Sequence, residues 1–500
     1  MAAAFDIEKT PEEKAVAESR RKFLKTAAIT TAGSVLLPRF LQAFPADRST
    51  KIAIIGAGIA GLNAAYQLHK MGLKATVYEA SGRVGGRMFS IKDKFGKGIT
   101  TDIGGEYIDT DHQEIIDLVK ELNLEFYDLR KDELEPQTFY FEGRFITENE
   151  LTEAIKPFAK NIEADIQSLP EIINYKNAED FQHLDDLSIT EYLIKLGIKG
   201  WLYNFLNLVL TREYGMEASE QSAINFLIMF IEPDGNKTSY ELFGEAHEVL
   251  KIKGGSQQLT NQLYAQIKPQ VLIQHKLTSI QKNGKKYSLD FLEKGRIKNV
   301  LADYVIIAIP FTLLRLIKMD VPMPAEKKKC IAELGYGNSG KFIIGVHKKP
   351  WREKGQRGYL FTDLPFGCAW DSSLMQSETE GGYTVFGGGN FMQMPCNEAN
   401  GKVLKTFTSQ IAEIYTDIQE ASTGKTLNFC WEKYPYSLAG YSSFKKGQWS
   451  TIAGWEAEPI GNIYFAGEHT SLTFQGYMNG AALTGRLAAE KIAEILKIKN

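Results

Sequence analysis

The sequence predicts an α/β fold in which a parallel sheet carries a nucleotide-binding turn and a discontinuous α+β domain completes the molecule. Three observations indicate this. An apolar run at 51–55 leads at once into a glycine-rich turn and a helical pattern, the run 304–310 is almost wholly apolar, and apolar residues recur at near-helical spacing between 155 and 208. The 500 residues allow about three folding units and a large core.

Composition and charge exclude several classes of protein. The chain is 44% hydrophobic, its glycines and prolines are spread along its length, and its formal net charge is only −3. These values argue against a disordered chain and give no electrostatic reason to expect a nucleic-acid or anionic-membrane partner. No run is long and apolar enough to span a bilayer.

The chain has four cysteines, and none of them forms a C-x-x-C pair. They are Cys330, Cys368, Cys396 and Cys430. They predict neither a zinc site nor a redox dithiol, so we expect no metal. A disulfide between two of them stays open, but four idle or buried thiols are the favoured interpretation.

The N-terminal segment resembles a bacterial twin-arginine export signal. SRRKFLK at 19–25 is followed by a mildly apolar stretch at 27–37 and then by Pro38. The apolar stretch, about 11 residues, is too short for a membrane helix. Residues 1–46 are therefore expected to direct the protein to the periplasm or outside the cell, with the cytoplasm as the alternative if the signal is retained. The competing interpretation is an amphipathic surface helix.

The first element after this segment is a dinucleotide-binding turn. GAGIAG at 56–61 lies between a β-rich run and a helical pattern at 62–71. Gly56 permits a tight turn, Gly58 lets the backbone approach a pyrophosphate, and Gly61 lets the helix pack on the strand. The next strand, at 74–78, ends in Glu79, whose carboxylate would accept a hydrogen bond from a ribose hydroxyl. The spacing predicts a Rossmann-like domain.

Motifs at both ends of the chain resemble those of the flavin amine oxidase family. RVGGR at 83–87 and TDIGGEY at 101–107 follow Glu79, and GNIYFAGE at 461–468 and GYMNGA at 476–481 lie near the C-terminus. The resemblance covers nearly all of residues 50–495. It implies FAD and a fold of the glutathione reductase-like type.

The resemblance also implies a set of FAD-binding residues. They are Gly56, Gly58, Ala60, Gly61, Glu79, Ala80, Arg83, Gly86, Arg87, Gly104, Gly105, Glu106, Leu277, Trp431, Gly467, Glu468, Gly476, Tyr477, Met478 and Ala481. Trp431 matches a family tryptophan that lies along the flavin ring. Gly440 stands where monoamine oxidases carry a flavin-linked cysteine, so the FAD is expected to be non-covalent.

Because these motifs lie far apart, the FAD-binding domain is expected to combine residues 50–126, 250–330 and 430–500. Apolar runs near 271–280 and a turn at Asn283-Gly284 predict strands and a hairpin in the middle piece. The substrate domain then takes residues 127–249 and 331–429. In its first piece apolar residues recur at near-helical spacing, which is more typical of a buried core than of a binding site. They form two sets, at 155, 162, 166 and 169 and at 194, 201, 205 and 208. Phe226, Met229 and Phe230 are candidates for the cleft.

The catalytic residues implied by the resemblance are Lys341, Tyr441 and Tyr477. The two tyrosines match the aromatic pair that flanks the amine, and Lys341 matches a lysine that reaches flavin N5 through a water. Some amino acid oxidases of the family hold the substrate carboxylate with an arginine, but the matching position here is Tyr107. Tyr107, Tyr441 and Tyr477 are therefore the expected substrate residues. Either Arg212 or Arg315 takes the carboxylate, or the substrate has none.

The leading hypothesis is an FAD-dependent oxidase of free L-amino acids that uses O2 and forms H2O2. Oxidation of monoamines or polyamines is the alternative. A flavin desaturase or a non-catalytic flavoprotein fits the residues less well, because neither requires the tyrosine pair. Members of the family often dimerise, so the resemblance also implies a homodimer.

Overall fold

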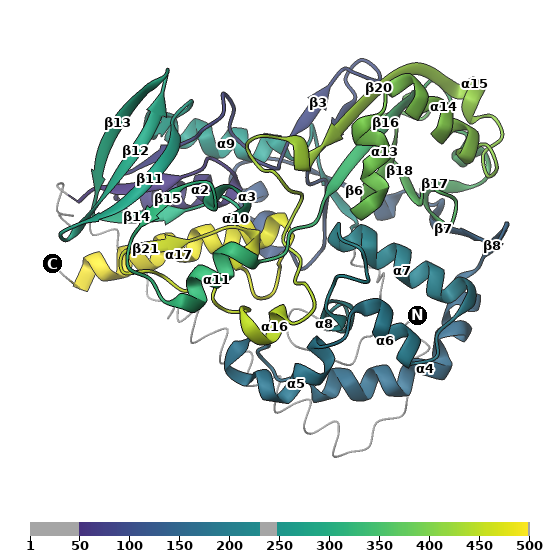
Figure 1. Ribbon diagram of the computed structural model, residues 1–500. Helices are drawn as coiled ribbons and strands as arrows, with labels where there is room; N and C mark the ends of the chain where they lie inside the picture. The colour runs from purple at the N-terminus through teal and green to yellow at the C-terminus, as the bar shows by residue number, and fades with distance from the viewer. Residues whose placement is uncertain (1–49, 231–247, 499–500) are drawn as a thin grey trace.

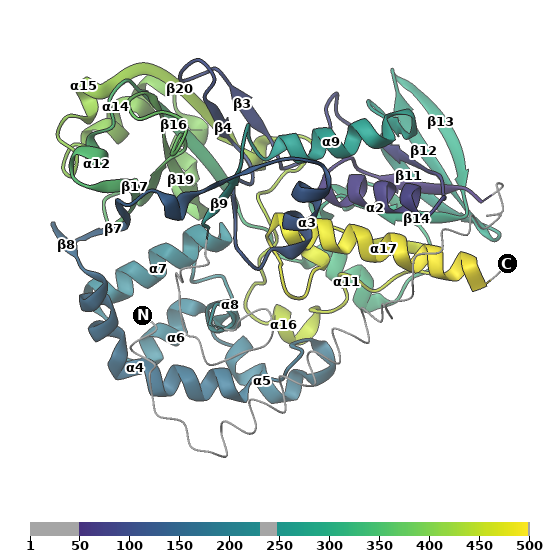
Figure 2. The same ribbon diagram turned by 180° about the vertical axis from the view of Figure 1, so that it is seen from behind.

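The computed structural model describes residues 50–230 and 248–498. Within these ranges two groups of elements lie side by side (Figures 1 and 2). One contains a five-stranded and a four-stranded sheet with their helices, and the other contains a seven-stranded sheet and a helical layer. The predicted export signal at 1–46 lies outside the described residues.

A five-stranded parallel sheet forms the centre of the first group. In spatial order its strands are β10 (Val271–Leu272), β2 (Ala75–Tyr78), β1 (Ile52–Ile55), β14 (Tyr304–Ile307) and β21 (Ile463–Phe465). β1 and β14 are buried along their whole length, as expected of central strands covered on both faces. Because every neighbouring pair is parallel, segments from three distant parts of the chain end at the same edge.

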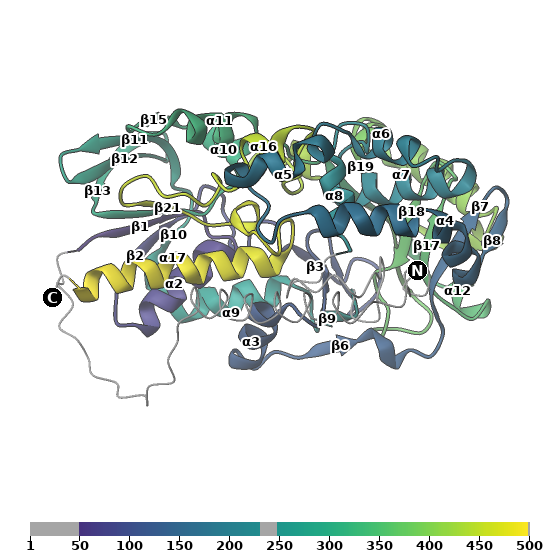
Figure 3. The same ribbon diagram turned by 90° about the horizontal axis from the view of Figure 1, so that it is seen from below.

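The two faces of this sheet are covered differently. Ile52 and Ile54 pack on one face against a layer of helices, whereas Ala53 and Ile55 belong to the core shared with the four-stranded sheet. The helices are α2 (Ile59–Lys70), α3 (Gln113–Glu121), α9 (Gln257–Ile267) and α17 (Met478–Ile498). Figure 3 shows α17 running along α2. Gly485 allows this close approach, because a Cβ there would lie 2.1 Å from the Ala60 carbonyl oxygen.

The four-stranded sheet confirms the predicted hairpin. Its order is β13 (Arg296–Ala302), β12 (Lys286–Glu293), β11 (Lys276–Asn283) and β15 (Lys318–Asp320). β11 and β12 are antiparallel and turn at Gly284, whose φ of +57° is one that glycine adopts without strain. Two helices, α10 (Phe311–Leu314) and α11 (Ala325–Glu333), lie on the chain on either side of β15.

The seven-stranded sheet places a lysine inside the protein. Its order is β20 (Ser422–Cys430), β16 (Ser339–Val346), β19 (Gly381–Gly388), β18 (Cys368–Asp371), β17 (Gln356–Thr362), β7 (Glu135–Phe141) and β8 (Arg144–Ile146). β16 is buried at every residue, so the Lys341 side chain must find its partners within the protein. The helices beside this sheet are α12 (Pro350–Glu353), α13 (Gln393–Asn397), α14 (Asn400–Ile411) and α15 (Ile418–Ala421).

The helical layer agrees with only part of the predicted pattern. Its helices are α4 (Glu148–Ser168), α5 (Ala178–Asp185), α6 (Ile189–Lys195), α7 (Gly200–Tyr214), α8 (Ala223–Ile228) and, from the C-terminal part, α16 (Gln448–Thr451). Ile155, Ile162 and Ile166 are buried along α4, as predicted. Ile194, however, is 60% exposed. α6 ends at Lys195 and Gly197 has a positive φ, so Ile194 does not share a helix with Phe205.

Two small antiparallel sheets connect distant segments. One pairs β3 (Ser90–Lys92) with β4 (Thr100–Asp102), and the other has the order β5 (Tyr107–Ile108), β9 (Leu250–Ile252) and β6 (Phe126–Asp128). In the second, Tyr107 is directly opposite Lys251. Its register therefore brings residues near 250 beside the motif at 101–107.

One cysteine pair corrects the expectation of four idle thiols. Cys396 and Cys430 form a disulfide, whereas Cys330 and Cys368 are buried free thiols. The bond forms because α13 lies against the end of β20, a tertiary contact that cysteine spacing does not reveal. In the part of the chain that the structure describes, no helix combines the length and the apolar character that a membrane span requires.

Candidate active site

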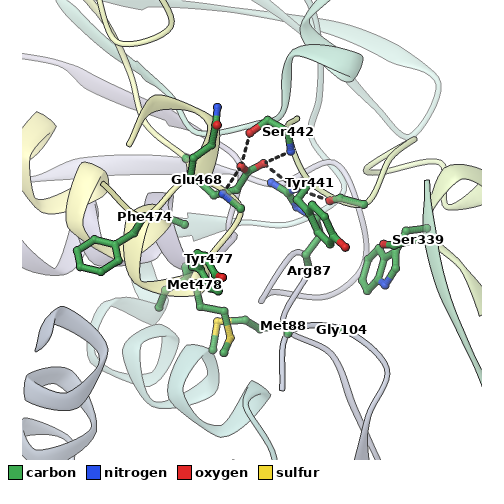
Figure 4. Close-up of a pocket in the computed structure, with 18 of the residues that line it drawn as sticks. Arg87, Met88, Gly104, Ser339, Tyr441, Ser442, Glu468, Phe474, Tyr477 and Met478 are labelled. Carbon is green, nitrogen blue, oxygen red and sulfur yellow. Dashed lines mark hydrogen bonds and ion pairs between the residues drawn. The ribbon is translucent and has the colours of Figure 1, made fainter. Parts of the chain in front are cut away.

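A cavity of about 940 Å³ is lined by residues from both groups of elements. This volume is near the upper end for sites that hold a cofactor and a small substrate. We call the part lined by residues of the segments 56–60 and 79–88, among them Gly56, Gly58 and Glu79, the nucleotide end. The part lined by Tyr107, Tyr359, Trp370 and Phe386 is the aromatic end. Figure 4 shows other residues of the same cavity, among them Arg87, Tyr441, Glu468 and Tyr477.

The glycine turn after β1 shapes the nucleotide end. Gly56 has a φ of +102°, and a Cβ there would lie 2.7 Å from the Ala308 carbonyl oxygen. A Cβ on Gly61 would lie 2.0 Å from the Gly56 carbonyl oxygen, so Gly61 packs behind the turn and does not line the cavity. α2 begins after Gly58 with no side-chain cap and no acidic residue in its first turn. Its first N–H groups are therefore available to an anion.

Glu79 is fixed at the end of β2 beside this turn. Its two carboxylate oxygens accept hydrogen bonds from the backbone N–H groups of Ala57 and Ser81, each at 2.8 Å. Each oxygen keeps a further lone pair for a hydroxyl group. Neither Ala80 nor Leu277 lines the cavity, although Leu277 is buried nearby in the core. Their roles in cofactor binding stay predictions.

The C-terminal motif is held by a buried ion pair. Arg87 donates to the Glu468 carboxylate at 2.9 Å, and Glu468 also accepts hydrogen bonds from the Ser442 hydroxyl at 2.6 Å and the Gly476 N–H at 3.0 Å (Figure 4). Burial opposes ionisation, but Arg87 and these donors hold the pKa of Glu468 below its usual range. The pair ties the predicted segments at 83–87 and 467–476 together.

Three segments meet where Gly104, Gly105, Trp431 and Met478 line the cavity, and we call this part of the cavity the slot. A Cβ on Gly104 would lie 1.8 Å from the Arg87 carbonyl oxygen and 3.1 Å from the Trp431 ring. A Cβ on Gly105 would lie 2.7 Å from the Met478 sulfur. The Trp431 indole N–H donates to the Ile103 carbonyl at 3.0 Å, which fixes the ring. Only glycine fits at 104 and 105 without displacing these neighbours.

These residues fit FAD. Uncapped helix N–H groups suit the pyrophosphate, the fixed Glu79 carboxylate suits a ribose, and the slot beside Trp431 suits the flavin ring. Of the remaining predicted FAD residues, Ala60, Arg83, Gly86, Glu106, Gly467 and Ala481 also line the cavity.

Tyr441 and Tyr477, the predicted aromatic pair, are both anchored at the end of α7. The Tyr441 hydroxyl donates to the Arg212 carbonyl oxygen at 3.0 Å, and the Tyr477 hydroxyl donates to the Glu213 carboxylate at 2.9 Å. Burial, together with the negative charge of Glu213, raises the pKa of both tyrosines well above the usual range. Both phenols therefore stay protonated and act as donors. Consecutive residues thus fix the two rings, and both rings line the cavity.

The aromatic end is a continuous wall of rings. Trp370 stacks on Tyr359 with centroids 5.6 Å apart and also contacts Tyr107 at 5.7 Å and Phe386 at 5.3 Å. Such a wall excludes water and accepts apolar parts of a substrate. Met229 lines the cavity as predicted, whereas Phe226 and Phe230 are buried in the core and do not.

Arg212 is a buried cation at this cavity that forms no ion pair within 4.0 Å among the described residues. It is only 7% exposed, its guanidinium lies 3.9 Å from the centre of the Phe391 ring, and its Nε and one terminal nitrogen make no hydrogen bond. Burial lowers the pKa of Arg212 to about 10, which still leaves it charged near neutral pH. The other candidate, Arg315, donates to the carbonyls of Ile331 and Leu334 and does not line the cavity.

Lys341 belongs to a buried network that the sequence did not reveal. Its ammonium group lies 2.6 Å from a Glu106 carboxylate oxygen, 2.9 Å from the Asp102 carbonyl and 3.0 Å from the Gly104 carbonyl. The second Glu106 oxygen binds Lys251 at 2.6 Å. Sequence analysis missed both Lys251 and Glu213. Two features of the sequence could have indicated them. Glu213 is an acid directly after Arg212, and Lys251 is a lysine in an apolar run just before GGS at 254–256.

The chain matches the family model for flavin containing amine oxidoreductases over residues 59–493. It is 27% identical to dog amine oxidase [flavin-containing] B over 472 residues, which covers 88% of this chain and 85% of that protein. It is 25% identical to the putative L-amino-acid oxidase YobN of Bacillus subtilis over 473 residues, with 88% and 94% covered.

Two solved structures show the same fold. Cyclohexylamine oxidase from Brevibacterium oxydans IH-35A superposes with a TM-score of 0.79 and 20% identity, over 90% of this chain and 99% of that one. A putrescine oxidase bound to putrescine superposes with a TM-score of 0.77 and 20% identity, over 89% and 99%. The family match spans most of the chain, from the start of α2 into α17, and includes Gly104, Trp431 and both tyrosines. The chain therefore belongs to the flavin-containing amine oxidoreductase family.

Proposed function

We propose that the protein is an FAD-dependent oxidase of free L-amino acids. Bound FAD would accept a hydride from the amine-bearing carbon and pass the electron pair to O2 as H2O2, and the released imine would hydrolyse to a 2-oxo acid and ammonia. The protein would supply a binding site for the zwitterion, orientation of the carbon-hydrogen bond and exclusion of water. The observation that carries the proposal is the buried cation Arg212 at the cavity.

The Arg212 guanidinium has the Phe391 ring beside it, but two of its nitrogens make no hydrogen bond, and a buried charge with unmet donors is costly unless a ligand completes them. A carboxylate is the usual partner, because its two oxygens match the donors of the guanidinium. The Arg212 guanidinium also interacts electrostatically with Tyr441, and both tyrosines line the same cavity. An amino acid with its carboxylate at Arg212 would therefore have its amine near the Tyr441 and Tyr477 rings.

The two rings would position a neutral amine and exclude water from it. Their hydroxyls are occupied by Arg212 and Glu213, which leaves the electron-rich faces for the substrate nitrogen. Tyr107 and its neighbours in the aromatic end would receive the side chain of the amino acid.

Non-covalent FAD is part of the proposal. A Cβ on Gly440 would lie 2.2 Å from the Ser339 hydroxyl oxygen, so the position that carries the flavin link in monoamine oxidases has no room for a side chain here. Cys396 and Cys430 are bonded to each other, and Cys330 does not line the cavity. Cys368 is a free thiol that does line it, but burial raises its pKa and so keeps the thiol protonated. Acid should release the flavin from the protein.

Oxidation of a diamine or polyamine is the second candidate. Glu213 lines the cavity and holds the Tyr477 hydroxyl, and its carboxylate would suit a second ammonium group. The putrescine oxidase with the same fold is consistent with this alternative. Arg212 opposes it, because a dication gains nothing from a buried guanidinium.

The test compares paired substrates in an Arg212→Met variant. L-phenylalanine and phenethylamine differ only in the carboxylate, and their anaerobic bleaching of the flavin is followed by stopped flow. Loss of a charged hydrogen bond predicts a fall of about 10- to 200-fold in the rate with L-phenylalanine and little change with phenethylamine. Arg315→Met, the other arginine, is the control and should leave both rates near wild type. Equal losses on both substrates, or wild-type bleaching by amines alone, would refute an amino acid oxidase.

We also propose that the protein is exported by the twin-arginine pathway. The Cys396–Cys430 disulfide supports this, because such bonds persist mainly outside the reducing cytosol. In a bacterial host with this pathway, the wild type should reach the periplasm with two titratable thiols, Cys330 and Cys368. A double variant, Arg20→Lys and Arg21→Lys, should stay in the cytoplasm. There the disulfide would be reduced, so the variant should have four titratable thiols. Equal distribution of the two forms between the fractions would rule out this route.

A further inference from the structure

Three charged side chains form a buried row against the cavity wall. Lys251 and Lys341 each lie 2.6 Å from a different oxygen of Glu106. The exposed fractions of the side chains are only 3%, 6% and 2%. The three residues come from β9, β16 and the segment between β4 and β5, so the row exists only in the folded protein.

The hydrogen bonds of Lys341 leave it no spare donor. An ammonium group has three N–H donors and no lone pair. Lys341 has three protein acceptors within 3.0 Å, namely the Glu106 carboxylate and the carbonyls of Asp102 and Gly104. It would have to give up one of these to hold a water molecule. Lys341 is therefore a fixed positive charge behind Gly104.

Glu106 would cancel that charge if it had no other partner. One of its oxygens accepts from Lys341 and from the Trp370 indole N–H at 3.2 Å, and the other accepts from Lys251. Burial opposes ionisation of Glu106, but the two ammonium groups hold its pKa below the usual range. Lys251, Lys341 and Glu106 sum to one net positive charge. Without Lys251 the remaining pair would be neutral. The neighbouring Asp102 carboxyl is also buried, and burial together with the charge of Glu106 raises its pKa, which disfavours its charged form.

We propose that Lys251 is a positioning residue which pairs with Glu106 and thereby makes this row of charges net positive toward the flavin. A buried positive charge stabilises negative charge nearby because little water screens it. The row would therefore favour the reduced, anionic form of the flavin and the binding of anions to the oxidised ring. Lys251 acts on the cofactor side, so its effect rests on bound flavin and not on which amine is the substrate.

A purely structural role is the competing explanation. Lys251 also donates to the Ser372 carbonyl at 2.8 Å and thereby ties β9 to the segment after β18. Removing it would then loosen the wall without changing the charge that the flavin meets. The two explanations differ in what they predict for Glu106, because both residues hold the wall but carry opposite charges.

The experiment measures the affinity of the holoenzyme for sulfite, an anion that adds to oxidised flavin, and the two-electron reduction potential in dye equilibration. Lys251→Met should weaken sulfite binding about tenfold and make the potential about 30 mV more negative, the equivalent of a tenfold change for a two-electron couple. Lys251→Arg keeps the positive charge, so its sulfite affinity and its reduction potential should lie close to those of the wild type. Lys253→Met is the matched control, because Lys253 lies two residues away on the surface and pairs only with Glu125 among the described residues. It should match the wild type.

Glu106→Gln decides between the two explanations. Removing the negative charge leaves at least one net positive charge, so this variant should bind sulfite at least as tightly as the wild type. Weaker sulfite binding in both Glu106→Gln and Lys251→Met would overturn the proposal in favour of a structural role. If Lys251→Met holds no flavin, Lys251→Arg and Glu106→Gln carry the test, and weak sulfite binding by Glu106→Gln again overturns it.

Discussion

The nucleotide end and the aromatic end of the cavity are built in different ways. At the nucleotide end the backbone forms much of the surface, through the turn at Gly56, the first N–H groups of α2 and the slot at Gly104. At the aromatic end side chains form it, and their positions depend on contacts between distant segments. A backbone site tolerates almost no change of residue, whereas a side-chain site can change its ligand by single substitutions.

The largest effect is expected from a methyl group at the nucleotide end. Gly56→Ala would put a Cβ 2.7 Å from the Ala308 carbonyl oxygen at a φ of +102°, so the turn must move. We expect the purified variant to contain almost no flavin while keeping its secondary structure. The measurements are the absorbance of bound flavin per protein and circular dichroism.

Gly72→Ala is the matched control for this prediction. Gly72 also has a positive φ, +79°, but no atom lies within 4 Å of its Cβ position. It should cost only about 1 kcal/mol of stability from backbone strain and keep its flavin. If Gly56→Ala keeps a full complement of flavin, the close approach at this turn does not shape the cofactor site.

The same division explains what the sequence predicts. Gly56, Gly58 and Glu79 are recognisable because the turn, the helix start and the strand end are adjacent in the chain, so local pattern decides their geometry. The hairpin at Gly284 is predictable for the same reason. A buried strand such as β14 is also predictable from local sequence, because the run at 304–307 is apolar along its whole length and wholly buried.

Side chains that meet through tertiary contacts are not predictable in this way. Lys251 reaches Glu106 only because β9 pairs with β5, and Cys396 reaches Cys430 only because α13 packs on β20. Arg212 was named from sequence as one of two arginines, and only its burial beside the cavity separates it from Arg315. The prediction that Ile194 shares a helical face with Phe205 was wrong, because α6 ends at Lys195 and Gly197 interrupts the helical spacing.

A smaller effect is expected from the hydroxyl groups of the two tyrosines. Both rings are held from the end of α7, but Tyr477 donates to the carboxylate of Glu213 and Tyr441 donates to a neutral carbonyl. Hydrogen bonds to charged groups contribute about 1.5–3 kcal/mol and neutral ones about 0.5–1.5 kcal/mol. Tyr477→Phe should therefore lower kcat/KM about 10- to 100-fold, and Tyr441→Phe only about 2- to 10-fold.

The two phenylalanine variants serve as controls for each other, because each keeps its ring and loses one hydroxyl. Flavin content should stay at the wild-type level in both, so that kcat/KM reports on placement of the ring. Adding Glu213→Gln to Tyr477→Phe should cost little more, because the two changes remove the same hydrogen bond. Equal losses in the two single variants would mean that ring packing, and not the charge on Glu213, fixes the aromatic pair. The placement of Tyr441 and Tyr477 would then depend on shape as strictly as the nucleotide end does.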